Sequence, residues 1–117
     1  MRPAFMILPQ LIRLHLDYEK NAHAFFELQA RDALDWLQAG GVQLGPETRM
    51  LDLGCGHGYP GQLCREAGAQ VVFADFEDLR LDTLKEAPFR QIDLNQADLA
   101  DYGRHDLVMC SNVLEHL

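Results

Sequence analysis

Residues 50–61 read MLDLGCGHGYPG, and this stretch decides how the rest of the sequence is interpreted. An apolar run with an acid, typical of a short buried strand, is followed by four glycines. Glycine at this density weakens regular structure, because it loses more backbone entropy on folding than other residues do. Its position directly after a strand-like segment therefore indicates a sharp turn that lets a ligand approach the backbone.

Strand-like and helix-like segments alternate from residue 49 onward. Apolar and β-branched runs predict strands at residues 49–53, 69–75, 89–94 and 105–111. Helix patterns lie at residues 59–68 and 76–87, and a further one begins at residue 112. This alternation predicts an α/β protein with βαβ units and a parallel sheet covered on both faces.

The N-terminal part has a different pattern. Apolar residues recur at three- and four-residue spacing over residues 10–39, which predicts helix with a break near Asn21, and Gly40-Gly41 provides a stop signal. We therefore expect two parts: an N-terminal helical cap over residues 1–45 and a sheet domain over residues 46–117.

Composition limits the partners and the compartment. The 117 residues are 48% hydrophobic and carry a net charge of −8. Nucleic acids and anionic membranes reward an excess of Lys and Arg, so neither is an expected partner of this segment. Pro9, Arg13 and Asp17 interrupt the apolar N-terminus well before the ~20 apolar residues that a membrane span needs. Three cysteines are too few for a disulfide scaffold and favour a reduced, cytoplasmic setting.

The glycine loop and a later acid form a nucleotide-binding arrangement, in which a strand, a loop and a helix precede an acid at the end of the next strand. Glycines at 54, 56 and 58 give G-x-G-x-G, because Tyr59 stands where the dinucleotide fingerprint needs glycine. Asp75 follows Gly54 by 21 residues, the spacing at which a carboxylate accepts hydrogen bonds from ribose hydroxyls. An acid there repels a 2′-phosphate and disfavours NADP.

Together these motifs resemble the class I S-adenosylmethionine-dependent methyltransferases. The residues that carry the resemblance are MLDLGCGHG at 50–58, VVFAD at 71–75, IDL at 92–94 and HDLVMCSNVLEHL at 105–117. The likeness is strongest to the branch that includes ubiquinone-biosynthesis and small-RNA 2′-O-methyltransferases. It implies a Rossmann-like, doubly wound parallel sheet with strand order 3-2-1-4, of which residues 46–117 would be the first half, truncated after the fourth strand.

The resemblance also implies a role for each residue of an S-adenosylmethionine site. Asp52 would order the loop and help to place the methionyl amino group, above a floor of loop glycines. Asp75 would accept from both ribose hydroxyls, Asp93 would accept from the adenine amino group, and Leu94 would lie on the ring face. Ser111 and Asn112 would lie under the reacting methyl group. The implied cofactor-binding set is Asp52, Gly54, Gly56, Gly58, Asp75, Asp93, Leu94 and Ser111.

The Glu115-His116 pair has more than one interpretation. Glu115 can cap the last helix beside an exposed or satisfied His116, and His116 is also a candidate general base. Related enzymes hold a divalent ion with E-x-x-E-H at this helix, but Asn112 replaces the first of those carboxylates. We therefore predict no tight metal site in this chain, and no catalytic residue is assigned beyond the candidate His116.

Two other functions are compatible with the same pattern: an NAD-binding oxidoreductase fragment, and a non-catalytic fold remnant that serves as a binding module. Tyr59 and the V-L-E-H-L ending speak against NAD. The sequence does not identify the methyl acceptor, which could be a small molecule or a macromolecule. The segment at 105–111 is apolar on both faces, and we expect it to form an exposed edge strand that pairs with a second copy of the chain.

Overall fold

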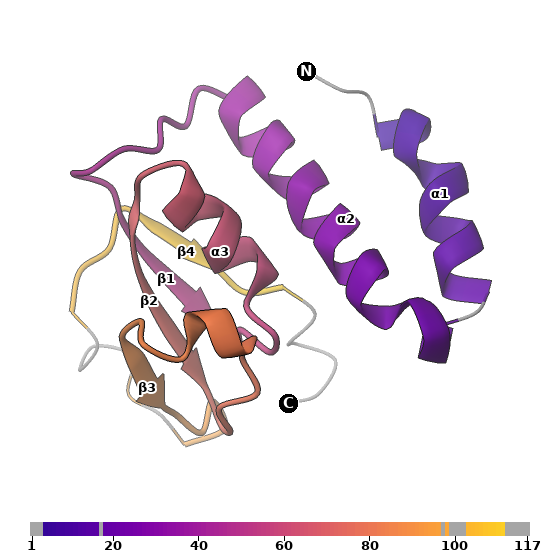
Figure 1. Ribbon diagram of the computed structural model, residues 1–117. Coiled ribbons are helices and arrows are strands. Elements are labelled where there is room, and N and C mark those ends of the chain that lie inside the picture. Colours follow the sequence, from indigo (N-terminus) through magenta and orange to yellow (C-terminus); the bar gives the residue numbers. More distant parts are fainter. Residues whose placement is uncertain (1–3, 17, 97, 99–102, 112–117) are drawn as a thin grey trace. The chain divides into compact units, whose positions relative to one another are not determined.

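The computed structural model describes residues 4–16, 18–96, 98 and 103–111. The chain divides into two compact units, Met1–Gln43 and Leu44–Leu117, and each is described by itself. The first unit is helical and the second contains the sheet (Figure 1).

The first unit is a pair of helices that run antiparallel in Figure 1, α1 (Ala4–Leu16) and α2 (Tyr18–Ala39). Helix was predicted from residue 10, but α1 begins earlier and includes Pro9, which removes one backbone donor from the helix interior. The predicted break near Asn21 is also wrong, because the helices separate between Leu16 and Tyr18. The stop is confirmed: the Gly40 amide donates to the Trp36 carbonyl, and Gly41 has a φ of 96°.

The second unit contains a four-stranded sheet in which every described pair of neighbouring strands is parallel. Its strands are β1 (Arg49–Leu53), β2 (Gln70–Asp75), β3 (Phe89–Gln91) and β4 (Leu107–Met109). Their order is β3-β2-β1-β4, which confirms the predicted Rossmann-like topology. In register, Asp52 lies opposite Phe73 on one side and opposite Met109 on the other.

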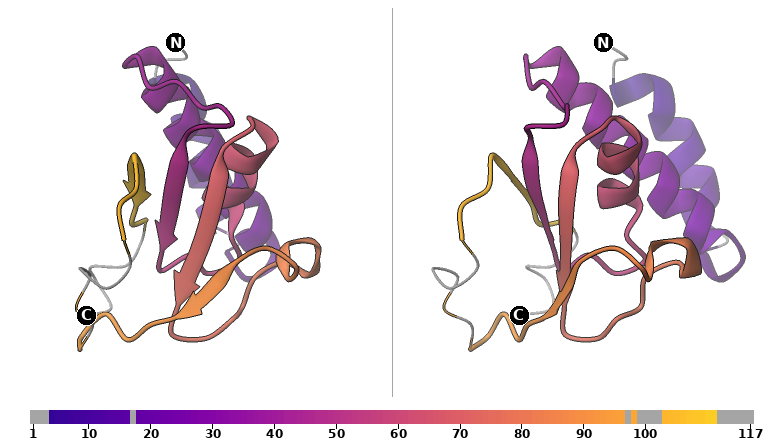
Figure 2. Two further views of the ribbon diagram at one scale, coloured as in Figure 1. Left: turned by 90° about the vertical axis from the view of Figure 1, so that its left-hand side faces the viewer. Right: turned by 60° about the vertical axis from the view of Figure 1, so that its left-hand side comes forward.

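Helix α3 (Tyr59–Glu66) connects β1 to β2 and covers one face of this sheet (Figure 2). Pro60 lies in its first turn, where the missing backbone donor has no intrahelical partner to lose. The helix ends before Gly68, whose φ of 105° is unfavourable for other residues. On the face of the sheet opposite α3 lies an apolar cluster, which we call the second apolar cluster. It contains Leu51, Leu53, Ala74 and Ile92, with Val72 and Leu94 packed against it.

The connection from β2 to β3 is not the helix that was predicted for residues 76–87. It contains only a single 3-10 turn, η1 (Asp82–Leu84), and is organised around the buried side chain of Arg80. Arg80 pairs with both oxygens of Asp78 at 2.7 and 2.8 Å, and it donates to the carbonyls of Leu84 and Ala87 at 2.7 and 2.9 Å. We call this set of contacts the Arg80 clamp.

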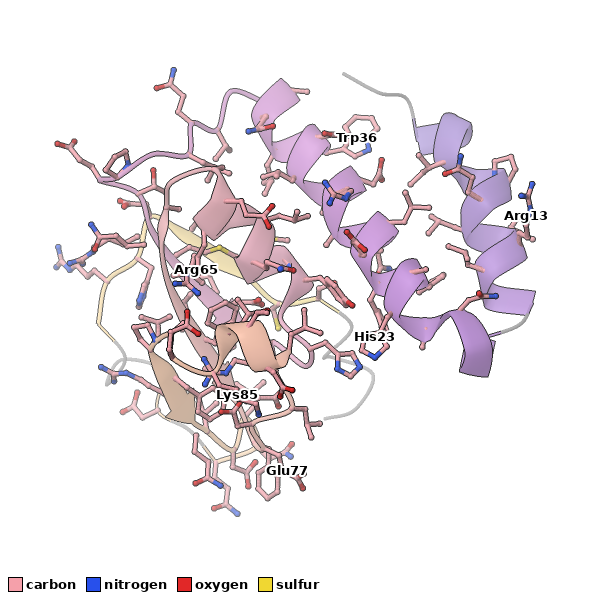
Figure 3. All side chains as sticks on the ribbon, viewed as in Figure 1. Arg13, His23, Trp36, Arg65, Glu77 and Lys85 are labelled. Carbon is pink, nitrogen blue, oxygen red and sulfur yellow. The ribbon has the colours of Figure 1, made fainter. Side chains whose placement is uncertain are left out.

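Aromatic rings and a lysine complete the surroundings of the Arg80 clamp. The Arg80 guanidinium lies 5.5 Å from the ring centre of Phe73 and 4.7 Å from that of Phe89. Lys85, labelled in Figure 3, donates to the Asp78 carbonyl at 2.8 Å. The Arg80 side chain thus bonds to carbonyl groups that a regular helix would pair with backbone amides alone, and the Leu84 carbonyl also accepts from the Ala87 amide.

Candidate functional site

The loop after β1 lies against the end of β2 at the carboxyl edge of the sheet. The amides of Gly54 and Cys55 both donate to the carbonyl of Ala74, at 2.8 and 3.0 Å. Ladder hydrogen bonding therefore continues beyond β1 for one more residue pair before the chain turns away. Ligands of open α/β sheets bind at this edge, in the crevice outside the carboxyl ends of the strands.

Asp75 joins the end of β2 to the glycine loop. Its Oδ2 accepts from the amide of Gly56 at 2.8 Å, and its Oδ1 accepts from the amide of Phe76 at 2.7 Å. Each carboxylate oxygen has two lone pairs, so each retains one acceptor position after these bonds. The loop and the acid that the sequence spacing singled out are therefore in direct contact.

The loop glycines have positive φ angles, but they have different steric surroundings. The φ angles of Gly54, Gly56 and Gly58 are 68°, 53° and 94°. A Cβ at Gly56 would meet nothing within 4 Å, so this part of the loop faces open space. A Cβ at Gly58 would lie 2.7 Å from Leu84 Cδ1 and 3.3 Å from the Phe73 ring, so this position is packed by the chain itself, and its φ of 94° also favours glycine.

Asp52 lies beneath the loop and is 1% exposed. Its Oδ2 accepts from the amide of Gly61 in the first turn of α3 at 3.0 Å. Burial raises the pKa of this carboxyl to about 7; the Gly61 hydrogen bond opposes the rise and the nearby charge of Asp75 adds to it. Asp52 therefore titrates near neutral pH, whereas an ordinary aspartate is fully ionised there.

The remaining described candidates follow β3 and β4 at the same edge. The amide of Ile92 donates to the carbonyl of Asp75 at 2.8 Å, which places Asp93 directly beyond the end of β2. Asp93 accepts from the amide of Asn95 at 2.9 Å, and Leu94 packs on the second apolar cluster. Ser111 comes two residues after Met109, as Gly54 comes two residues after Asp52, its partner in register. Asn112, Glu115 and His116 lie outside the described residues.

A protein-family model described as "Methyltransferase domain" matches residues 51–117. The chain belongs to the class I methyltransferase family. The match includes the glycine loop, the strand-end acid Asp75 and all of β4. This family match favours a methyltransferase over the alternative of an NAD-binding oxidoreductase fragment.

Among curated relatives, the methyltransferase chain is similar to enzymes named ubiquinone biosynthesis O-methyltransferase. The one from Bordetella avium is 29% identical over 108 residues, which cover 84% of this chain and 42% of the relative. Those from Aromatoleum aromaticum and Acinetobacter baumannii are 29% and 26% identical over 72% of this chain, and 38% and 39% of their own lengths. The chain thus spans about 40% of the length of these relatives. No solved structure matches the chain.

Gly61 belongs to the candidate site, and the sequence pattern did not predict this. A Cβ at this position would clash with the ring of Phe73 and lie 2.9 Å from Asp52 Oδ2. Glycine therefore allows the first turn of α3 to approach the sheet closely enough for the Gly61 amide to reach the buried carboxylate. The available signal was a fourth glycine within the predicted helix, where glycine is unfavourable without a packing reason.

The methyltransferase chain carries two buried cysteines close to this site. Burial raises the pKa of the Cys55 thiol to about 12 and that of Cys64 to about 11, and Asp52 adds to both shifts. Both thiols are therefore protonated at neutral pH and pack as small apolar groups.

Within the residues that the structure describes, no three His, Cys, Asp or Glu side chains gather as metal ligands would. Of the helices described, none is long and apolar enough to cross a membrane.

Proposed function

We propose that the carboxyl edge of this sheet binds S-adenosylmethionine, and that the chain supplies the cofactor-binding part of a methyltransferase. The observation that carries the proposal is the hydrogen bond between the Gly56 amide and Asp75 Oδ2. It holds the open backbone of the glycine loop beside the strand-end acid. A bound nucleoside could then lie against the loop backbone while its ribose hydroxyls donate to the acid. Because the similar proteins are named O-methyltransferases, we propose an oxygen atom as the methyl acceptor.

The chemistry of the loop fits this ligand. S-adenosylmethionine has no phosphates, so the loop has no anion to surround and needs only bare backbone, as at Gly56. Asp75 retains one acceptor position on each oxygen for a ribose hydroxyl. Asp93 would accept from the adenine amino group, with Leu94 beside the ring.

The chain's own residues would bind and orient rather than transfer protons. When bound, S-adenosylmethionine supplies a methyl group that its sulfonium already activates. Asp75 places a carboxyl group at this edge, where it favours a cationic ligand, and the buried Asp52 lies beneath the loop. Ser111 would lie beneath the reacting group and help to align the acceptor, which is the main contribution a protein makes to such a transfer.

Titration calorimetry with S-adenosylmethionine and S-adenosylhomocysteine tests this proposal. Asp75→Ala removes two charge-assisted hydrogen bonds and should cost about 2–4 kcal/mol of binding free energy. Asp75→Asn, which keeps one acceptor oxygen, should lose less. Glu66→Ala is the matched control, because Glu66 is an exposed acid at the far end of α3.

The results separate the possible functions. Unchanged affinity in Asp75→Ala, with a folded variant, would disprove the ribose contact. A stable wild-type chain that binds neither compound would favour a non-catalytic binding module. Selective binding of NAD would contradict the cofactor assignment.

We also propose that the free edge of β4 pairs with a second copy of the chain in a cytoplasmic setting. Val108 is 53% exposed on this strand, and exposed apolar edges template pairing with other chains. The small number of cysteines, three in 117 residues, is consistent with a reducing compartment. Sedimentation should show self-association at about 100 μM, a range in which exposed edges associate, and Val108→Lys should reduce it. A wild-type monomer at that concentration would contradict this pairing.

A further inference from the structure

A second concave region lies at the opposite, amino-terminal edge of the sheet. It has a volume of about 570 Å³ and is formed by the first residues of β1 and β2, the last turn of α3, and the residues before β3 and β4. Its floor is apolar: Val72 is partly exposed and Pro88 is exposed, and the lining also includes the buried Met50 and Val71. The volume is within the range of about 300–1,000 Å³ that is typical of small-molecule pockets.

The charge of this cavity contrasts with that of the chain. The sequence has 18 acidic residues and 10 Lys or Arg, for a net charge of −8. The lining nevertheless contains Arg49, Arg65, Arg104 and His105, and no Asp or Glu is among the described lining residues. Cationic side chains from β1, α3 and the segment before β4 thus converge on an apolar floor in an otherwise acidic protein.

The three arginines have different partners, which determines what each can bind. Arg49 Nη2 donates to the Arg104 carbonyl at 2.6 Å, and the Arg49 amide donates to Asp106, so Arg49 fixes the segment before β4. Arg65, labelled in Figure 3, shares its guanidinium with the exposed Glu86 at 3.3 Å. The Arg104 side chain forms no hydrogen bond or ion pair with the residues that the structure describes, and Arg104 lines the cavity.

We propose that this cavity binds a small amphipathic phosphate ester, with its apolar body on the floor and its phosphate between Arg65 and Arg104. Guanidinium groups recognise phosphate through paired, charge-assisted hydrogen bonds, and two of them from separate elements fix its position. The apolar floor would distinguish such an ester from free phosphate. This site is separate from the glycine loop, which lies at the other edge of the same strands.

The test uses phenyl phosphate as the probe and amide chemical shifts of the full chain as the readout. We expect saturable shifts at residues 49, 65, 70 and 103–106, and none at residues 54–58. Inorganic phosphate should shift the same amides with at least tenfold weaker affinity, and phenol should not shift them. The affinity should fall as salt is added, because the contacts are ionic.

Two variants and a control link the shifts to the proposed contacts. Arg104→Gln and Arg65→Gln should each weaken binding about tenfold, whereas Arg104→Lys should retain more of it. Arg31→Gln, an exposed arginine paired with Glu27 in the other unit, should bind like the wild type.

Several results would overturn the proposal. They are absence of shifts at 10 mM probe, equal shifts with phenol, or unchanged affinity in both folded cavity variants. Displacement of the probe by S-adenosylhomocysteine would show that it occupies the carboxyl edge instead. None of these results depends on whether the carboxyl edge binds its proposed cofactor.

Discussion

Two crossovers, β1 to β2 and β2 to β3, each join a pair of neighbouring parallel strands, but different interactions stabilise them. The first uses α3, whose backbone satisfies its own hydrogen bonds and whose close approach depends on Gly61. The second has no α-helix and depends on the Arg80 clamp, where one side chain pairs with backbone carbonyls and with Asp78. One crossover is regular in its backbone, and the other is organised by a buried arginine side chain.

The comparison shows where each crossover is vulnerable. Many weak, repeated hydrogen bonds hold the first crossover, so its critical position is the one that sets its distance from the sheet. A single buried guanidinium organises the second through its bonds to Asp78 and to the Leu84 and Ala87 carbonyls, so its removal breaks several contacts at once. Single substitutions should therefore have unequal effects in the two connections.

The largest effect is expected for Arg80→Leu. It removes two buried, charge-assisted hydrogen bonds to the carbonyls of Leu84 and Ala87 and the ion pair with Asp78, and it should lower the free energy of unfolding by about 3–5 kcal/mol. Urea unfolding monitored by circular dichroism measures this loss. Arg31→Leu, which breaks an exposed pair, should change stability by less than about 1 kcal/mol. Equal effects of the two substitutions would show that the clamp is not what holds the second crossover.

Gly61→Ala tests the first crossover at its point of closest approach. The added methyl group would overlap the Phe73 ring and crowd Asp52, so α3 must shift. Overpacking of this kind costs about 2–3 kcal/mol, only partly offset by alanine's better helix propensity. Gly45→Ala is the control, because a Cβ there meets nothing within 4 Å. A stable Gly61→Ala variant would mean that α3 has room to move.

The two crossovers also differ in how far the sequence predicted them. The first was predicted because apolar runs mark β1 and β2, and Pro60 and Gly68 mark the ends of α3. The second was predicted as a helix because residues 76–87 contain good helix formers, which is a local signal. Arg80 overrides that signal through contacts with Asp78, Leu84 and Ala87, and no periodic pattern reveals that a charged side chain will be buried.

The candidate site, too, was predicted from the sequence only in part. The spacing in the sequence was sufficient to predict that Asp75 lies near the glycine loop. Parallel strands end at one edge of the sheet, and Asp75 is at the end of β2. Spacing did not reveal that Gly58 packs against Leu84, or that Gly61 lets its amide reach Asp52. These are properties of the packed core, to which residues from several elements contribute.

A smaller effect is expected in the pH dependence of the free energy of unfolding, which should differ between the two crossovers. The folded-state pKa of Asp52 is raised to about 7, so the stability that depends on this group is fully present below about pH 4 and is lost as the pH rises to about 7. Asp52→Asn should flatten that slope, by an amount on the order of 1–2 kcal/mol between pH 5 and pH 8. Unfolding midpoints across this range measure it, with the exposed Asp82→Asn as control. An unchanged slope in Asp52→Asn would assign the titration to another group.

Asp78 in the second crossover should respond in the opposite direction. Its hydrogen bonds with Arg80 hold the pKa of its carboxyl well below the usual range. The stability that this pair contributes is present above about pH 4, the ordinary value for Asp, and is lost as the pH falls further. Acid should therefore weaken the second crossover under conditions in which Asp52 favours the folded state.

The smallest effect is expected for Glu86→Gln, which removes the one described ion pair between the crossovers. Arg65 and Glu86 are 3.3 Å apart, and their side chains are 35% and 64% exposed. Exposed pairs of this kind contribute little, because water screens them and their side chains lose entropy. We expect no measurable change in the urea midpoint. A clear decrease would show that the two crossovers are coupled through this contact.

The Arg80 clamp also sets which substitutions this connection tolerates over evolutionary time. Every amino acid carries a carbonyl, so the acceptors at residues 84, 85 and 87 persist whatever side chains occupy those positions. Lys85 and Glu86 are exposed, so we expect many side chains to be tolerated at these positions. At Leu84 and Ala87, burial limits the size and polarity of the side chain. Arg80 has no such freedom, since only its fork of donors reaches all of these acceptors at once. A saturation library over residues 76–88 should therefore show one nearly invariant charged position within a permissive segment.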